Sequence, residues 1–94
     1  MIVKTREMGM THRDFFRTFP AVAQTTPWRQ DEDKVVLGVP EKQVAIHMGP
    51  EGERRIALLT LPTVNLRFEF EGFDETEANS FMDRFDLAFR RGGG

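Results

Sequence analysis

The chain has 94 residues, with 13 Lys and Arg against 15 Asp and Glu and a formal net charge of −2. A chain of this length can bury about 60–65% of its unfolded surface, which suffices for one core, so we expect a single globular domain over residues 1–94. It contains no cysteine, which excludes disulfides, thiolate nucleophiles and Cys-ligated metal sites and fits a reducing compartment. Without a membrane-length apolar run or a signal-peptide pattern, the sequence predicts a soluble cytoplasmic protein with no membrane partner.

The charges are spread unevenly along the chain. Residues 1–30 carry a small excess of Lys and Arg, and the remainder is acidic. A nucleic-acid-binding surface needs a basic stripe that neutralises several phosphates. Because the excess is too small for such a stripe, we predict no nucleic-acid partner.

The N-terminal segment offers two interpretations. Residues 2–7 are rich in β-branched side chains, which favours a short strand. Met8 and Met10 could also serve as translation starts, and residues 1–9 would then be a flexible extension. Both interpretations stay open at this point.

The first helix is predicted over residues 11–19. Thr11 is a good N-cap, and Asp14 lies three residues on, as in a capping box. One helix face then carries three aromatic side chains, Phe15, Phe16 and Phe19. Pro20 either ends this helix or opens a short further turn through residues 21–23.

A polar loop and four strands are predicted next. The loop spans residues 24–33, and the strands cover residues 34–39, 43–48, 53–61 and 64–71. Between them lie three predicted turns at Pro40–Lys42, Gly49–Gly52 and Pro62–Thr63. The alternation of apolar and polar side chains is strictest in the last strand, where Val64, Leu66, Phe68 and Phe70 share one face.

The second helix is predicted over residues 74–90. Asp74 is the N-cap, Glu77 occupies the third helical position, and Gly92 is the expected C-terminal stop. Apolar side chains recur with helical spacing at Ala78, Phe81, Met82, Phe85, Ala88 and Phe89. This stripe should face the core.

These elements predict an α+β fold in the order (β)-α-β-β-β-β-α. We expect a four-stranded antiparallel meander with both helices packed on one face, and residues 2–7 as the candidate fifth strand. The element order resembles that of TATA-box-binding-protein-like folds. The resemblance concerns the fold and implies no function.

The sheet face away from the helices is unusual, because the strand over residues 53–61 is apolar on both sides. Ile56 and Leu58 alternate with a second apolar set, whereas a sheet covered on one side normally has one polar face. Either residues 20–33 or the N-terminal strand cover this side, or a second subunit does. The candidate interaction face consists of Ala57, Leu59, Leu61, Arg67 and Glu69.

Catalytic, cofactor and metal sites are not indicated. The two histidines, His12 and His47, lack a third ligand at metal spacing, and Ser80, the only serine, lies in no nucleophile motif. The paired carboxylates at Glu69 and Glu71, and at Asp83 and Asp86, are typical of solvated faces with local ion pairs. We therefore predict a protein that is not an enzyme and needs no cofactor.

Two further features suggest alternative functions. Eight phenylalanines could line a pocket for an apolar ligand between sheet and helices, although a packed core explains them better. They are Phe15, Phe16, Phe19, Phe68, Phe70, Phe81, Phe85 and Phe89.

The C-terminal tail is the second such feature. It comprises Arg90, Arg91, Gly92, Gly93 and Gly94. Its terminal glycines resemble those of ubiquitin-like and sulfur-carrier proteins, whose terminal carboxylate is adenylated and transferred, but here they follow a helix instead of a strand. The leading hypothesis is a non-enzymatic domain acting through protein contacts, as a homodimer or an accessory subunit. A Gly-tail carrier and an apolar-ligand binder are the alternatives.

Overall fold

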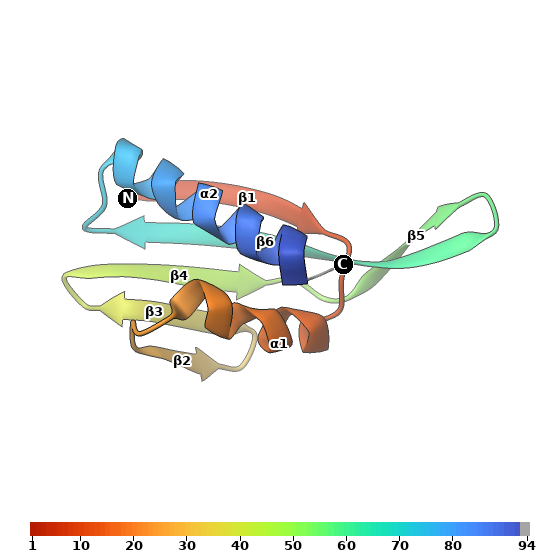
Figure 1. Ribbon diagram of the computed structural model, residues 1–94, viewed down its shortest axis with the longest axis horizontal. Helices are drawn as coiled ribbons and strands as arrows, with labels where there is room; N and C mark the ends of the chain where they lie inside the picture. The colour runs from red at the N-terminus through yellow and green to blue at the C-terminus, as the bar shows by residue number, and fades with distance from the viewer. Residues whose placement is uncertain (93–94) are drawn as a thin grey trace.

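The computed structural model describes residues 1–92 of the chain, and side chains for residues 1–90. In chain order the elements are β1 (Ile2–Met8), α1 (His12–Ala23), β2 (Trp28–Asp31), β3 (Lys34–Val39), β4 (Lys42–Met48), β5 (Gly52–Ile56), β6 (Leu59–Glu71) and α2 (Glu75–Gly92). Five strands pair antiparallel in the spatial order β1-β6-β4-β3-β2, and β5 pairs with the first part of β6 (Figure 1).

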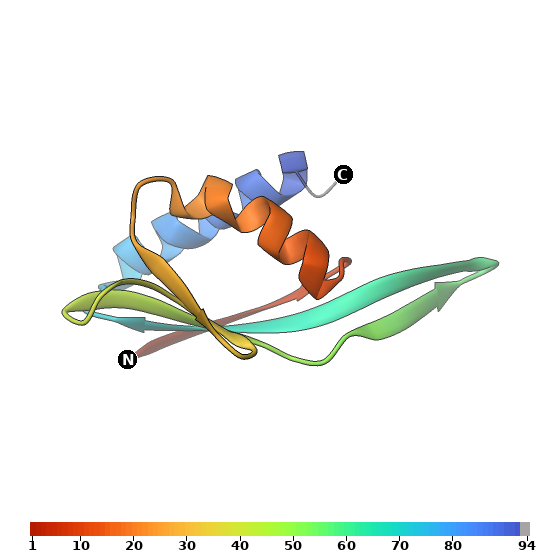
Figure 2. The ribbon, with the colours of Figure 1, turned by 90° about the horizontal axis from the view of Figure 1, so that it is seen from below.

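Both helices lie on one side of the sheet, and no described element covers the other side (Figure 2). The expected α+β class, with an antiparallel sheet and two helices on one face, is confirmed. We call the uncovered side the open face.

The core lies between the helices and the sheet. The four apolar side chains of β6, from Val64 to Phe70, are each at most 1% exposed, as the strict alternation of this strand predicts. The α2 stripe packs against them, with the rings of Phe68 and Phe85 edge-to-face at 4.9 Å between centroids. Aromatic packing of this kind stabilises a core beyond its buried area.

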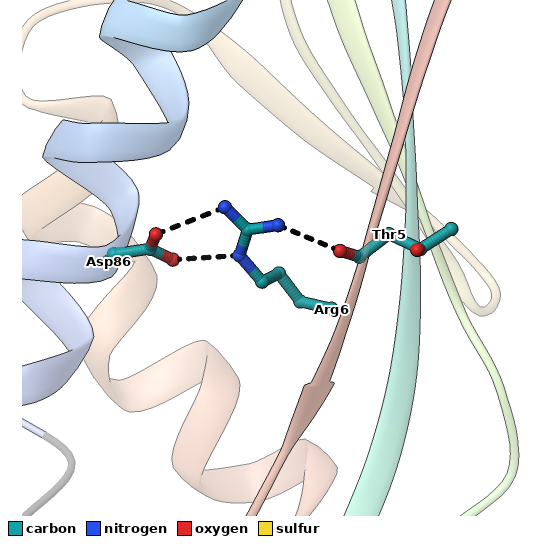
Figure 3. A network of polar contacts seen from close by, with 3 residues as sticks. All are labelled: Thr5, Arg6 and Asp86. Atoms are coloured by element: carbon teal, nitrogen blue, oxygen red, sulfur yellow. Dashed lines mark hydrogen bonds and ion pairs between the residues drawn. The ribbon is translucent and has the colours of Figure 1, made fainter.

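The first strand is a full member of the sheet. β1 pairs with β6 over seven register positions, from Ile2 opposite Phe70 to Met8 opposite Val64. Arg6 donates from Nε and Nη2 to the two carboxylate oxygens of Asp86 in α2, at 3.2 and 3.1 Å, and from Nη1 to the carbonyl of Thr5 (Figure 3). Such bidentate pairing fixes orientation, so β1 is tied to both β6 and α2.

The predicted caps of both helices are confirmed. The side chain of Thr11 accepts from the Asp14 backbone N–H at 3.1 Å, and the Glu77 backbone N–H donates to Asp74 Oδ1 at 2.8 Å. The Glu77 carboxylate also accepts from the Asp74 backbone N–H at 3.0 Å, which completes a second capping box.

This cap predicts a specific acid sensitivity. The hydrogen bond from the Lys42 side chain, followed by that from the Asp74 backbone, lowers the pKa of Glu77 below its ordinary value. A carboxyl whose pKa is lower in the folded state stabilises the fold above its unfolded pKa, and this stabilisation is lost as pH falls through the folded pKa. We expect Glu77→Gln to lower the melting temperature at pH 7 and to flatten its decline on acidification.

Thermal melts at pH 7 and across the acidic range provide the measurement. Glu71→Gln is the matched control, because Glu71 is an exposed carboxylate without an ion pair to any residue that the structure describes. Equal pH profiles for the two variants would contradict the role assigned to Glu77.

The first helix extends past Pro20, which is one of the two alternatives that the sequence left open. α1 continues through Pro20 to Ala23, because a further turn closes when the Gln24 N–H donates to the Pro20 carbonyl at 2.9 Å. α2 reaches Gly92, the last residue that the structure describes, so the predicted stop lies at the limit of the described residues.

The predicted loop over residues 24–33 is wrong, since it contains β2. Trp28–Asp31 pairs with β3 across a turn at Glu32 and Asp33, where Glu32 adopts a φ of +56°. The Trp28 ring lies edge-on to Phe19 at 5.0 Å between centroids. The segment is polar because β2 is an edge strand exposed along its length. Such a strand lacks the alternation of apolar and polar residues by which strands are predicted from a sequence.

The predicted strand over residues 53–61 and its flanking turns are also wrong. β4 and β5 do not form a hairpin at Gly49–Gly52, because both pair with β6. The hairpin turn lies at Ala57 and Leu58, with φ of +54° at Ala57. Pro62 lies inside β6 and causes no turn. Each strand of a two-stranded ribbon has one edge without a partner strand, and proline is tolerated there because its missing N–H leaves no sheet hydrogen bond unmade.

Candidate interaction site

A two-stranded hairpin projects beyond the helices at one end of the molecule (Figures 1 and 2). We call residues 52–63, which form β5, the turn and the start of β6, the arm. It elongates the chain, whose principal extents are 46 × 23 × 23 Å. Every arm residue from Gly52 to Leu61 is exposed.

The arm carries four exposed aliphatic side chains. The register places Ile56 opposite Leu59 and Arg54 opposite Leu61, so Ile56, Leu59 and Leu61 share one face of the ribbon with Arg54. Leu58 lies in the turn. The exposed fractions are 52% for Ile56, 101% for Leu58, 63% for Leu59 and 42% for Leu61. A contiguous exposed apolar patch marks an interaction site more often than single exposed residues do.

The base of the arm is held by polar contacts to the rest of the domain. Arg54 pairs with Glu7 at the end of β1. The carbonyl of Gly49 lies 2.7 Å from His12 Nε2, and the Gly49 N–H donates to the Asn65 carbonyl at 2.8 Å. These contacts link the start of the β4–β5 connection to α1 and β6, and β5 to β1.

The residues of the expected interaction face divide between two places. Leu59, Leu61, Arg67 and Glu69 alternate along β6 and therefore share one face of this strand. Leu59 and Leu61 lie on the arm, whereas Arg67 and Glu69 lie on the open face of the five-stranded sheet, up to about 33 Å further along the strand. Ala57 lies in the turn, outside both strands.

A small polar cluster occupies the open face. His47 Nε2 lies 2.7 Å from Glu69 Oε1, and Arg67 Nη2 lies 3.1 Å from Glu69 Oε2. Both oxygens of Glu69 are therefore engaged, as in a solvated ion-pair network. Within residues 1–92, no group of three or more His, Cys, Asp or Glu side chains is placed to hold a metal ion.

A hollow of about 580 Å³ adjoins the base of the arm. Its lining comes from β1, β4 and β6 and includes Glu7, His47, Gly49 and Asn65. The alternation of side chains along the strands places most of these residues on the open face. Leu59 and Leu61 lie on the same side. The hollow arises where β4 ends and Gly49 contributes no side chain. Sequence reasoning missed it, because its walls come from three distant segments.

The phenylalanines predicted as core or pocket lining lie in the core. Seven of the eight are buried, and Phe16 is partly buried. Their rings contact one another, for example Phe15 with Phe89 at 5.4 Å between centroids. A separate hollow of about 620 Å³ lies between the helices and includes Val22, Arg84 and Leu87 in its lining.

The C-terminal tail is described only in part. Arg90 is exposed near the end of α2, and the helix runs on through Arg91 and Gly92. The predictions made for Gly93 and Gly94 fall outside the described residues.

Neither helix in the described part of the chain is both long and apolar enough to cross a membrane. Comparisons with known proteins add no family to this geometry: no protein-family model, no curated protein and no solved structure matches the chain significantly.

Proposed function

We propose that this chain is a non-enzymatic protein-interaction domain and that the arm is its contact element. The observation that supports this proposal is the exposure of Ile56, Leu58, Leu59 and Leu61 on a hairpin without a core of its own. An isolated two-stranded hairpin is marginally stable in water. A partner that covers its apolar face would remove these side chains from water, which is favourable by about 25 cal/mol per Å².

The charges of the arm favour a protein partner over an anionic polymer or lipid surface. Arg54 is already paired with Glu7, and Glu51 and Glu53 lie close to Arg55 in the sequence. Binding to nucleic acid or anionic lipid requires several basic residues, whereas residues 52–63 carry only Arg54 and Arg55 against Glu53. The partner is a second copy of the chain or a larger assembly of which this chain is an accessory subunit.

Replacing Leu59 with glutamate tests the proposal. Native mass spectrometry of the untagged protein from its own host should show the wild type bound to a partner and Leu59→Glu as a bare monomer. A buried charge without a counterion opposes association strongly. Val39→Glu is the matched control, because Val39 is an aliphatic residue of similar exposure, 48%, outside the arm.

The control should keep the partner, and circular dichroism should show that all three proteins are folded. Bare monomers for the wild type and both variants would refute the interaction function. The same spectra address the carrier alternative, because a mass shift on the C-terminal carboxylate that disappears when Gly93 and Gly94 are deleted would favour a carrier.

A further inference from the structure

The two helices differ in length, and the longer one overhangs the sheet beside the end of the shorter one. α1 ends at Ala23, whereas α2 extends beyond this point with its N-terminal part (Figures 1 and 2). A hollow of about 410 Å³ lies there, between α2, the end of β3 and the start of β4. Its lining shares Val22 and Arg84 with the hollow of about 620 Å³ between the helices. The two hollows therefore adjoin at these residues.

The two hollows differ in the side chains that line them. The hollow beside β3 and β4 includes three hydroxyl side chains above an apolar floor, namely Thr26, Thr76 and Ser80. The hollow between the helices has a run of aliphatic side chains from both helices, Ala21, Val22, Leu87 and Ala88, together with Arg17, Thr18 and Gln24. An elongated molecule with a polar head and an apolar body matches this sequence of surfaces.

Arg84 lies where the two hollows adjoin. Its guanidinium lies over the ring of Phe81, 5.6 Å from the centroid, and it forms no ion pair with any residue that the structure describes. The other two cations of the lining each have a carboxylate partner, Arg17 in Asp14 and Lys42 in Glu77. The positive charge of Arg84 is therefore available to a ligand.

We propose that the joined hollows bind a small amphipathic anion, with its carboxylate or phosphate head at Arg84 and its aliphatic body along the hollow between the helices. Arginine pairs with such heads through two parallel N–H donors. Ser80 lies one turn before Arg84 on the same face of α2, and its hydroxyl is a further donor for the head. A neutral ligand would leave Arg84 unpaired, and a cation would be repelled by it. This site is separate from the arm and goes beyond the proposed interaction function.

Decanoate is the probe, and an NMR titration of the isotope-labelled full chain is the measurement. We expect saturable binding with a Kd below about 1 mM and the largest amide shifts around Val22, Ser80 and Arg84. Decyl phosphate tests the second head group, and the tighter of the two anions identifies the head. Decanol and decylammonium have the same body and should bind at least about tenfold more weakly, because they lose the charge-assisted hydrogen bonds.

Variants separate the head from the body of the ligand. Arg84→Gln should weaken decanoate binding at least about tenfold, whereas Arg13→Gln should not, since Arg13 is an exposed arginine of α1 that lines neither hollow. Leu87→Gln should weaken binding as well, because Leu87 contributes apolar surface to the hollow between the helices. Circular dichroism should show that all three variants are folded.

Three results would overturn this inference. They are the absence of saturable binding of both anions, decanol or decylammonium binding as tightly as decanoate, and unchanged decanoate binding by Arg84→Gln. Leu59→Glu, which disrupts the proposed contact element, should leave decanoate binding unchanged. A ligand site that fails with a host complex still present removes this inference alone, whereas a bare monomer from the host that still binds decanoate removes only the interaction function.

Discussion

Phe85→Ala is expected to lower the free energy of unfolding by about 3–5 kcal/mol. The Phe85 side chain is fully buried on α2, with ring centroids 4.9 Å from Phe68 and 4.4 Å from Phe89. Truncation removes these contacts and leaves a cavity that the surrounding rings, held by both helices and the sheet, cannot readily fill.

Urea unfolding analysed by linear extrapolation measures this loss. Leu87→Ala is the matched control, since Leu87 is an aliphatic residue of the same helix that is 45% exposed. We expect the control to change stability by less than about 1 kcal/mol, as surface substitutions usually do. A similar loss for both variants would mean that the buried face of α2 is assigned incorrectly.

Gly72→Ala is expected to cause the second large loss. Gly72 connects β6 to α2 with a φ of +76°, and an added Cβ would lie 2.0 Å from the carbonyl oxygen of Glu41. The left-handed backbone costs a non-glycine residue about 1–3 kcal/mol. The steric conflict adds to this, because the neighbour is backbone at the β3–β4 turn and cannot rotate away as a side chain could.

Thermal and urea unfolding of Gly72→Ala should show the loss directly. Gly9→Ala is the control, because a Cβ there would have only the Pro62 carbonyl oxygen within 4 Å, at 3.9 Å, and Gly9 has no positive φ. The control should be neutral or slightly stabilising, since alanine reduces the entropy of the unfolded chain. A stable Gly72→Ala variant would show that the turn can adopt another conformation.

Local patterns in the sequence were sufficient for the helices and for the buried half of β6. Thr11 and Asp74 cap helices through hydrogen bonds to residues three positions away, and the alternation from Val64 to Phe70 needs only the period of a strand. The apolar character of Leu59 and Leu61 was likewise evident, and so was the expectation that a partner could cover them. Each of these signals lies within a few residues of the chain.

Only the tertiary structure decided where the hairpin lies and that it projects. Gly49–Gly52 has the composition of a turn, but the chain continues along β6 there because pairing with a distant strand outweighs local turn preference. β1 ends at Met8, opposite Val64, and β4 ends at Met48, opposite Leu66. Beyond these positions β6 has only β5 beside it, so Leu59 and Leu61 are exposed on an arm. Strand lengths and pairing are non-local properties, which is why the composition of residues 53–61 could indicate an apolar surface but not its place.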